Sequence, residues 1–308
     1  MQGSYVVWRS MGRPPGAGFF SIVTSILAQI DIAEKKGLIP VVDLETHPSI
    51  YQEDEALMGT RNAWEYYFDQ PAGRALQDVE PGAEVSAGTF PRGYPYELSG
   101  STRYKELWDQ YVKPNSATRS FIAASAENMA ISSRTLGIHF RGAEMRRAKG
   151  HHHPPTLHQV NDAITWILNH YNFDDLLLVT EATQYSESLH RKWGSRLKTS
   201  PSFRLKYRNS YSLNYAPRAN HKYLLGLEAL RDASILSQCG GLICGRSNLS
   251  EAALMMGNNN LGVQNRISQG TNSRRPYVSP YLWYLKAALP AALGGFSKWS
   301  PDQNLAIK

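Results

Sequence analysis

The feature that most constrains the fold is a regular alternation of strand-like and helix-like segments in the second half of the chain. Short apolar runs typical of buried strands alternate there with segments whose apolar residues recur at helical spacing. The strands are expected at residues 135–140, 175–181, 203–208 and 240–245, and the helices at 155–171, 182–194, 221–238 and 247–257. This alternation predicts a parallel sheet with helices on both faces and ligands at the carboxyl ends of its strands.

The first half begins with the same pattern. A strand is expected at residues 5–8, a helix at 20–37 that stops at a glycine, and a second strand at 38–45. Together they form a β-α-β unit, in which a crossover helix joins two parallel strands. The loop before the helix is rich in glycine but does not match the Gly-x-Gly-x-x-Gly dinucleotide fingerprint.

The middle of the chain marks a domain boundary. Residues 46–104 predict loops with short helices and aromatic packing, and residues 106–130 predict two helices separated at Pro114-Asn115. We therefore expect an α/β fold with two Rossmann-like domains that face each other across a cleft. The N-terminal domain would span residues 1–130 and the C-terminal domain residues 131–308.

Composition indicates a globular protein and narrows its partners. Of 308 residues, 42% are hydrophobic and 11% aromatic, which is unlike a disordered chain. The net charge of +7 suits an anionic ligand such as a nucleotide, and equally an ordinary basic surface. Because no dense Lys/Arg tract interleaves with aromatic residues, nucleic acid is not favoured as a partner.

The cysteine content and the hydropathy of the chain indicate the cellular location to expect. Cys239 and Cys244 are too few for a disulfide framework, and their apolar surroundings predict a buried strand. No signal peptide is visible, and no apolar run approaches the ~20 residues that cross a bilayer. The apolar stretch at residues 287–296 is too short and is broken by Pro290. We expect a cytoplasmic protein without a transmembrane segment.

The candidate functional residues follow the predicted strand ends. They are His139, Arg141 and Gly142 after the first strand of the second half, Thr180 and Glu181 after the next, and Arg246, Ser247 and Asn248 after the last. An arginine fork can grip two phosphate oxygens, and the N–H groups and dipole of a helix N-terminus stabilise an anion. Each residue alone also has a structural explanation, such as a helix cap or a salt bridge. Their convergence at one sheet edge predicts a diphosphate site.

These segments, in this order, resemble the motifs of the fucosyltransferase superfamily. That group includes the protein O-fucosyltransferases, the core α1,6-fucosyltransferases and the rhizobial nodulation fucosyltransferase. LGIHFRG is similar to its His-x-Arg motif, DLLLVTEATQYSESL to its second motif, and LEALRDASILSQCGGLICGRSNLSEAALMMG to its third. In the first half, GAGFFSIVTSILAQIDIAEKKGLIPVVDLE and NAWEYYF resemble bacterial relatives. The resemblance covers most of residues 5–257.

The resemblance implies an inverting GT-B glycosyltransferase that needs no metal or other cofactor. The donor would be a nucleotide sugar, GDP-fucose in characterised members, and the acceptor a glycan or another hydroxyl compound. Arg141 would hold the β-phosphate and stabilise the leaving diphosphate, and His139 would position nucleotide or phosphate groups. The further donor-site residues that the resemblance implies are Gly16, Ala17, Gly18, Gly142, Thr180, Glu181, Asp232, Arg246, Ser247, Asn248 and Ser250.

The catalytic base is open at this point. Two carboxylates are candidates: Glu144, just after the His-x-Arg motif, and Asp43, at the end of the strand at 38–45. Either also has an ordinary explanation as a surface or salt-bridged acid. Glu181 stands where the superfamily often has Asp, which leaves its contact with base or ribose open.

Three adjacent histidines suggest another chemistry. His151, His152 and His153 are expected to lie in a surface loop, because neighbouring side chains point in different directions and spaced zinc motifs are absent. Contact with the donor or acceptor is a second possibility and a metal site a third. Two other functions therefore stay open: a carbohydrate-binding protein of the same fold without transfer activity, and a metal-dependent hydrolase that uses these histidines.

Overall fold

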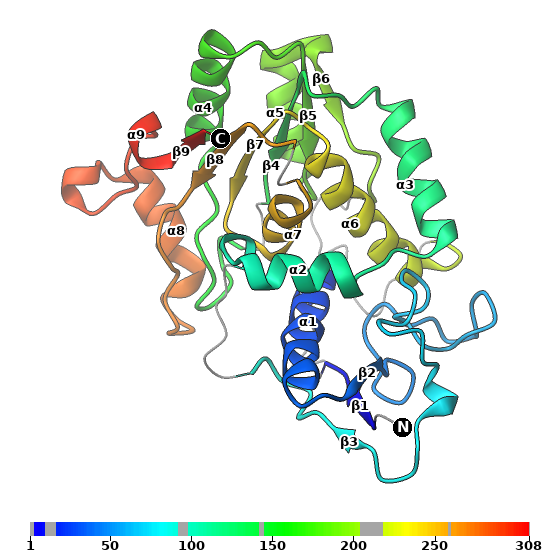
Figure 1. Cartoon of the computed structure of the whole chain (residues 1–308). Helices are drawn as coiled ribbons and strands as arrows, with labels where there is room; N and C mark the ends of the chain where they lie inside the picture. The colour runs from blue at the N-terminus through cyan, green and yellow to red at the C-terminus, as the bar shows by residue number, and fades with distance from the viewer. Residues whose placement is uncertain are drawn as a thin grey trace. The chain divides into compact units, whose positions relative to one another are not determined.

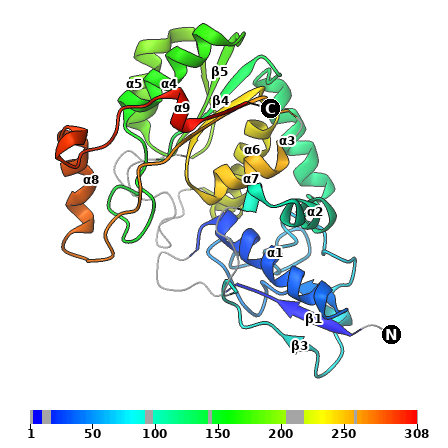
Figure 2. The same ribbon diagram turned by 60° about the vertical axis from the view of Figure 1, so that its left-hand side comes forward.

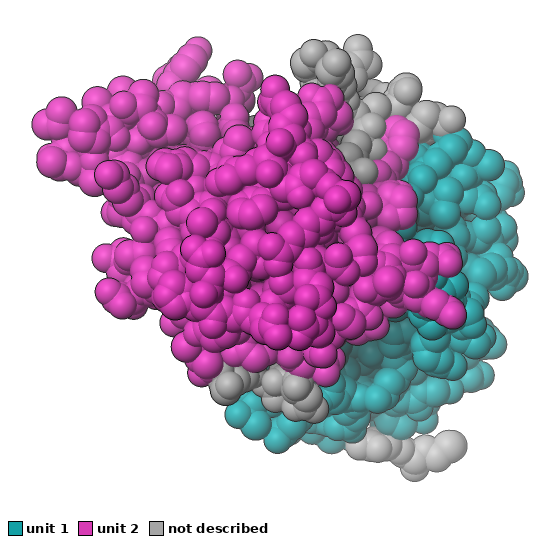
Figure 3. Space-filling model, turned by 90° about the horizontal axis from the view of Figure 1, so that it is seen from above, with its two compact units in different colours: residues 1–125, 211–231 teal, residues 126–210, 232–308 magenta. Residues whose placement is uncertain are grey.

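The structure is a computed structural model that describes residues 3–9, 17–91, 98–141, 145–203, 218–257 and 260–307. The chain forms two compact units, which Figure 3 shows in separate colours. The first contains residues 1–125 and 211–231, and the second residues 126–210 and 232–308. The return of residues 211–231 to the first unit has no counterpart in the sequence pattern.

The first unit is built on a three-stranded parallel sheet with the order β2-β1-β3. β1 (Ser4–Val7), α1 (Phe19–Lys35) and β2 (Ile39–Val42) form the predicted β-α-β unit, and β3 (Glu84–Val85) pairs with the other edge of β1. Most of α1 is buried, since apolar residues occupy more than one of its faces.

The region that follows β2 has little regular structure, as predicted. It contains the short 3₁₀ helices η1 (Leu76–Asp78) and η2 (Leu98–Gly100), before the two helices α2 (Thr102–Tyr111) and α3 (Ser116–Asn128). The aromatic residues Trp64, Tyr66, Tyr67 and Phe68 are all buried. Aromatic packing beneath the loops is therefore confirmed for this segment.

The second unit contains a six-stranded sheet with the order β6-β5-β4-β7-β8-β9 (Figure 1). Its strands are β4 (Thr135–His139), β5 (Asp175–Val179), β6 (Leu197–Thr199), β7 (Gly241–Gly245), β8 (Val263–Ile267) and β9 (Leu305–Ile307). The first five are parallel, and β9 is antiparallel to β8. The parallel sheet expected from the alternation is confirmed.

Helices connect these strands. They are α4 (Leu157–His170), α5 (Thr183–Trp193), the 3₁₀ helix η3 (Gly194–Arg196), α6 (His221–Ser237), α7 (Asn248–Met256), α8 (Ser279–Ala288), the 3₁₀ helix η4 (Ala291–Leu293) and α9 (Pro301–Asn304). The first four α-helices of this set lie within a few residues of their predicted ranges. None of the helices that the structure describes has the length and apolar character needed to span a membrane.

The third strand is the main difference from prediction. The run at residues 203–208 was expected to form it, but residues 204–208 lie outside the described part of the chain. The strand that pairs with β5 is instead β6 at Leu197–Thr199, directly after η3. Its three residues lack the apolar run by which the other strands are recognised.

The order of the strands determines where a ligand can bind. The chain moves outward from β4 through β5 to β6, then returns through α6 to the other side of β4 and continues with β7 and β8. The strand order therefore reverses between β4 and β7. In open α/β sheets the crevice at the carboxyl ends of such a pair is the usual ligand site. α6 packs closely on β4 at Gly137, where a Cβ atom would lie only 2.9 Å from the Leu236 side chain of α6.

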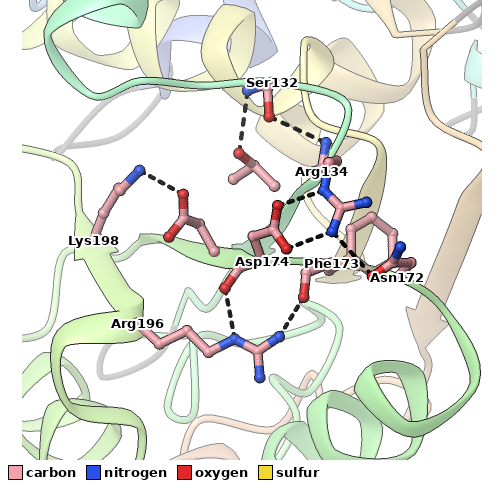
Figure 4. A network of polar contacts seen from close by, with 9 residues as sticks. Ser132, Arg134, Asn172, Phe173, Asp174, Arg196 and Lys198 are labelled. Carbon is pink, nitrogen blue, oxygen red and sulfur yellow. Dashed lines mark hydrogen bonds and ion pairs between the residues drawn. The ribbon is translucent and has the colours of Figure 1, made fainter.

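The amino ends of the strands are held by a polar network (Figure 4). Arg134 forms an ion pair and hydrogen bonds with the Asp174 carboxylate and donates to Asn172 Oδ1 at 3.0 Å. Arg196, the last residue of η3 before β6, donates from Nε to the Asp174 carbonyl oxygen at 2.7 Å and also donates to the Phe173 carbonyl oxygen. The network thus ties β4, β5 and β6 together at the edge opposite the expected ligand site.

Candidate functional site

The site begins at the carboxyl ends of β4 and β7, which are paired so that His139 lies opposite Cys244. β4 ends at His139, and two residues later Arg141 begins the loop that leads to α4. β7 ends at Gly245, and Ser247 is the N-cap of α7, where its Oγ accepts from the backbone N–H of Ser250 at 3.1 Å. This cap places the N-terminus of α7 next to His139.

A hydrogen-bonded cluster joins the strand to the helix. His139 Nδ1 lies 2.7 Å from Ser250 Oγ and 3.4 Å from Ser247 Oγ, and the two hydroxyl oxygens are 3.1 Å apart. Nε2 of His139 makes no hydrogen bond to any residue that the structure describes. The ring is thereby fixed in orientation while one nitrogen stays available.

The imidazole of His139 is neutral at physiological pH. Burial, together with the nearby Arg141 charge, lowers the pKa of His139 to about 3. Because a buried cation next to a guanidinium is unfavourable, the ring can donate or accept a hydrogen bond but does not contribute positive charge.

A shallow cleft that is open to solvent lies over this cluster. Its lining residues are His139, Arg141, Met145, His152, Pro154, Pro155, Gly245, Arg246 and Ser247. Among the described residues, the lining contains two arginines and no acidic residue. The cleft therefore favours an anion, in agreement with the dipole at the N-terminus of α7.

Among the described residues, Glu181 is the acidic residue that forms an ion pair with Arg141. Its Oε2 lies 3.7 Å from Nε of Arg141, and the two side chains are 27% and 35% exposed. At this distance and exposure the ion pair is weak. It holds the guanidinium near the end of β5 and leaves it accessible from the cleft.

The triple histidine was expected in a surface loop, and this expectation is wrong for His153. His151 is exposed and His152 lines the cleft, but His153 is 1% exposed and packs edge-on against Phe296 at 5.4 Å between ring centroids. The segment is held by backbone hydrogen bonds: Asn272 donates to the His151 carbonyl oxygen at 2.8 Å, and His153 donates to that of Gly270 at 3.0 Å. The three side chains therefore enter three different environments.

Two residues that the sequence did not single out shape this loop. The guanidinium of Arg146 lies over the rings of Trp283 and Tyr185, at 4.0 and 5.0 Å from their centroids. Asn272 donates from Nδ2 to the carbonyl oxygens of Arg146, Ala148 and Ser279. No local pattern predicts these roles, because their partners come from α5, α8 and the loop after β4.

Two of the predicted donor-site residues have structural partners. Thr180 is buried and donates from Oγ1 to the Phe140 carbonyl oxygen at 2.6 Å. Asp232, also buried, accepts from the hydroxyls of Ser200 and Ser202 at 2.5 Å each, and so links α6 to the residues after β6. Both side chains hold the strand ends in place and lie outside the lining of the cleft.

The remaining predicted residues are on the first unit or outside the described residues. Asp43 is buried after β2 and caps the next turn, where its Oδ1 accepts from the N–H groups of Glu45 and Thr46 at 3.0 and 2.9 Å. Ala17 and Gly18 precede α1, and the Gly18 carbonyl oxygen accepts from Ser21 at 2.8 Å. Gly16, Gly142 and Glu144 lie outside the described residues.

Among the described residues, no group of three or more His, Cys, Asp or Glu is arranged to hold a metal ion. The predicted residues that the structure brings together are His139, Arg141, Glu181, Arg246, Ser247 and Ser250, with Asn248 at the first turn of α7. A neutral imidazole, two guanidinium groups, hydroxyls and helix N–H groups form a site for a diphosphate or a similar anion.

Comparison with known proteins identifies the fold. No protein-family model matches the chain, and no curated protein matches it in sequence. Among solved structures it is similar to NodZ alpha-1,6-fucosyltransferase co-crystallized with GDP, at 17% identity and a TM-score of 0.54, over 87% of this chain and 96% of that chain. Fucosyltransferase NodZ from Bradyrhizobium matches at 16% identity and a TM-score of 0.55, with the same shares covered.

A plant structure extends the comparison. An Arabidopsis thaliana FUT1 mutant in complex with GDP matches at 11% identity and a TM-score of 0.50, over 86% of this chain and 70% of that chain. The α/β architecture with two parallel sheets is therefore the GT-B fold of the fucosyltransferase structures, as the sequence motifs indicated.

Proposed function

We propose that this protein is an inverting glycosyltransferase that transfers fucose from GDP-fucose to a hydroxyl group of a glycan. The observation that carries the proposal is the cationic cleft at the carboxyl ends of β4 and β7, formed by residues of the His-x-Arg and Ser-rich segments. Similar structures of the same fold contain GDP, and one was soaked with GDP-fucose.

Arg141 supplies the main electrostatic contribution in this proposal. As the bond between the anomeric carbon and the β-phosphate oxygen breaks, negative charge develops on the departing GDP. The Arg141 guanidinium binds that diphosphate, with Arg246 and the N–H groups at the start of α7 beside it. Removal of one such contact typically costs about 10²–10³ in rate.

His139 positions the diphosphate without adding charge. If Nδ1 accepts from Ser250, the neutral ring carries its hydrogen on Nε2, which is then a donor toward a ligand in the cleft. The acceptor hydroxyl attacks the opposite face of the sugar and loses its proton to a base. Glu144 stays the proposed base. Asp43 is less suited, because two N–H groups and the Thr46 hydroxyl already donate to its carboxylate.

The proposal is tested by binding before turnover. Wild-type protein and the variant Arg141→Ala should be titrated with GDP, UDP and CMP by calorimetry, and thermal unfolding should be recorded with and without each nucleotide. GDP at about 100 times its Kd should add about 2.7 kcal/mol to stability, and UDP and CMP much less. Arg141→Ala should lose GDP binding at least about tenfold and nearly all transfer from GDP-fucose.

The matched control is Arg191→Ala, an exposed arginine on α5 that does not line the cleft. It should bind GDP as the wild type does. Equal responses to all three nucleotides would contradict a GDP site, and near-normal turnover of Arg141→Ala would contradict the role given to this residue. GDP binding without any transfer would favour the carbohydrate-binding alternative. Loss of activity after EDTA treatment would favour the hydrolase alternative, which the separate environments of the three histidines do not support.

A further inference from the structure

Helix α8 has one face that packs on its own unit and another that does not. Trp283 anchors the first face: it is 6% exposed, and its Nε1 donates to the Pro154 carbonyl oxygen at 2.8 Å. On the other face, Tyr281 is 72% exposed and Leu285 56%, and Tyr277 just before the helix is 88% exposed. Tyr281 and Leu285 are four positions apart within the helix and therefore share one side of it. Figures 1 and 2 show α8 at the periphery of the second unit.

The exposed apolar residues are concentrated here. Nine large hydrophobic side chains are exposed among the described residues, and six of them lie between residues 277 and 293. Five form a continuous stretch that we call the α8 patch: Tyr277, Val278, Tyr281, Tyr284 and Leu285. Single exposed apolar residues are common on protein surfaces, whereas a contiguous group marks an interaction surface.

The two chain segments that carry and adjoin the patch contain basic residues and no acidic ones. Residues 252–301 contain no Asp or Glu but include Arg274, Arg275 and Lys286. The neighbouring segment 145–161 also has no acidic residue and adds Arg147 and Lys149.

Contacts place these two segments together. Gly150 donates to the Ser273 carbonyl oxygen at 3.2 Å, and the Arg147 guanidinium lies 5.9 Å from the ring centroid of Tyr284. Exposed arginine and lysine side chains therefore border the exposed tyrosine rings of the patch. The same two segments contribute Arg146 and Trp283, whose side chains pack against each other beneath the patch.

We propose that the α8 patch docks the protein onto the surface of an anionic lipid bilayer. Tyrosine rings are favoured at the level of the headgroups, Leu285 and Val278 can enter the acyl boundary, and arginine and lysine bind lipid phosphates. A second copy of this chain fits less well, because a two-fold interface would bring the positive side chains of the two copies together, where they repel each other. The aliphatic residues and the lack of acidic groups likewise suit lipid better than a sugar. This proposal does not depend on the proposed transferase activity.

The test is flotation of the full-length protein with vesicles. Wild-type protein should float with vesicles of phosphatidylcholine containing roughly one-third phosphatidylglycerol, should not float with phosphatidylcholine alone, and should be released by salt. The double variant Tyr281→Ser, Leu285→Ser should bind about tenfold more weakly or worse, because its apolar insertion is lost. The double variant Lys149→Gln, Arg275→Gln should bind about 25-fold more weakly, at about fivefold for each base.

Matched controls lie away from the patch. Val85→Ser removes an exposed apolar side chain on β3, and Lys192→Gln removes an exposed base on α5. Both should float as the wild type does, and all variants should keep the wild-type affinity for GDP. Equal binding to neutral and anionic vesicles, or patch variants that float normally, would overturn the proposal. It would also be overturned by a wild-type dimer that ignores vesicles and dissociates in Tyr281→Ser, Leu285→Ser, which would make the patch a self-association surface.

Discussion

The neutral, buried His139 makes a quantitative prediction about acid stability. Burial and the Arg141 charge hold the pKa of His139 at about 3 in the folded protein, against 6.5 for an exposed histidine. The unfolded chain therefore binds a proton at this residue below about pH 6.5, whereas the folded protein binds it only as the pH approaches 3. As a result, the free energy of unfolding falls as the pH drops through this range. At about pH 5 the unfolded residue is almost fully protonated, and the loss from His139 alone is about 2 kcal/mol relative to about pH 7.5.

The variant His139→Asn isolates this contribution. Its amide group takes the position of Nδ1 and can keep the contact with Ser250, but it does not titrate. Urea unfolding at the two pH values should show that the wild type loses about 2 kcal/mol more than His139→Asn between them. The exposed His190, which contacts Thr199 Oγ1, provides the control: His190→Asn should lose as much as the wild type. If the wild type and His139→Asn lose the same free energy, His139 is not held neutral by the fold and the account of the site is wrong.

Two further predictions concern buried polar groups. His153 is buried, neither of its ring nitrogens has a hydrogen-bond partner among the described residues, and burial lowers its pKa to about 4. His153→Leu should therefore raise the unfolding free energy by about 1 kcal/mol at neutral pH and more near pH 5, as measured by urea unfolding. Asp232 accepts two short hydrogen bonds from Ser200 and Ser202. Asp232→Asn should therefore lower the unfolding free energy by about 2 kcal/mol, while GDP affinity measured by calorimetry stays unchanged. A selective loss of GDP binding without destabilisation would instead make Asp232 a donor-site residue.

The sequence predicts the second sheet well because its central strands are buried on both faces. β4, β5 and β7 are continuous apolar runs bounded by helices, and residues just past such runs must reach the same edge of the sheet. That geometry is enough to bring His139, Arg141 and Ser247 together. The pattern does not predict β6 because two of its three residues are polar, and its position is set by pairing with β5.

The histidine segment could not be predicted for a different reason. The burial of His153 depends on Phe296 and on the backbone of residue 270, both more than 100 positions away in the chain. The cation–π contacts of Arg146 with Tyr185 and Trp283 likewise depend on residues from α5 and α8. Such contacts follow from the tertiary fold, and a local sequence pattern contains no signal for them.

The network around Arg134 and Asp174 has a consequence for the electrostatics of the protein. β4 has five residues, and at about 3.3 Å per residue the strand alone places roughly 16 Å between that network and the end of the strand near Arg141. This separation is about twice the distance over which salt at physiological strength screens exposed charges. Salt therefore largely screens the exposed charges at the two ends of the sheet from each other. The salt dependence of anion binding should report only the cations of the cleft, and a charge reversal at Arg134 should change folding stability without changing that slope.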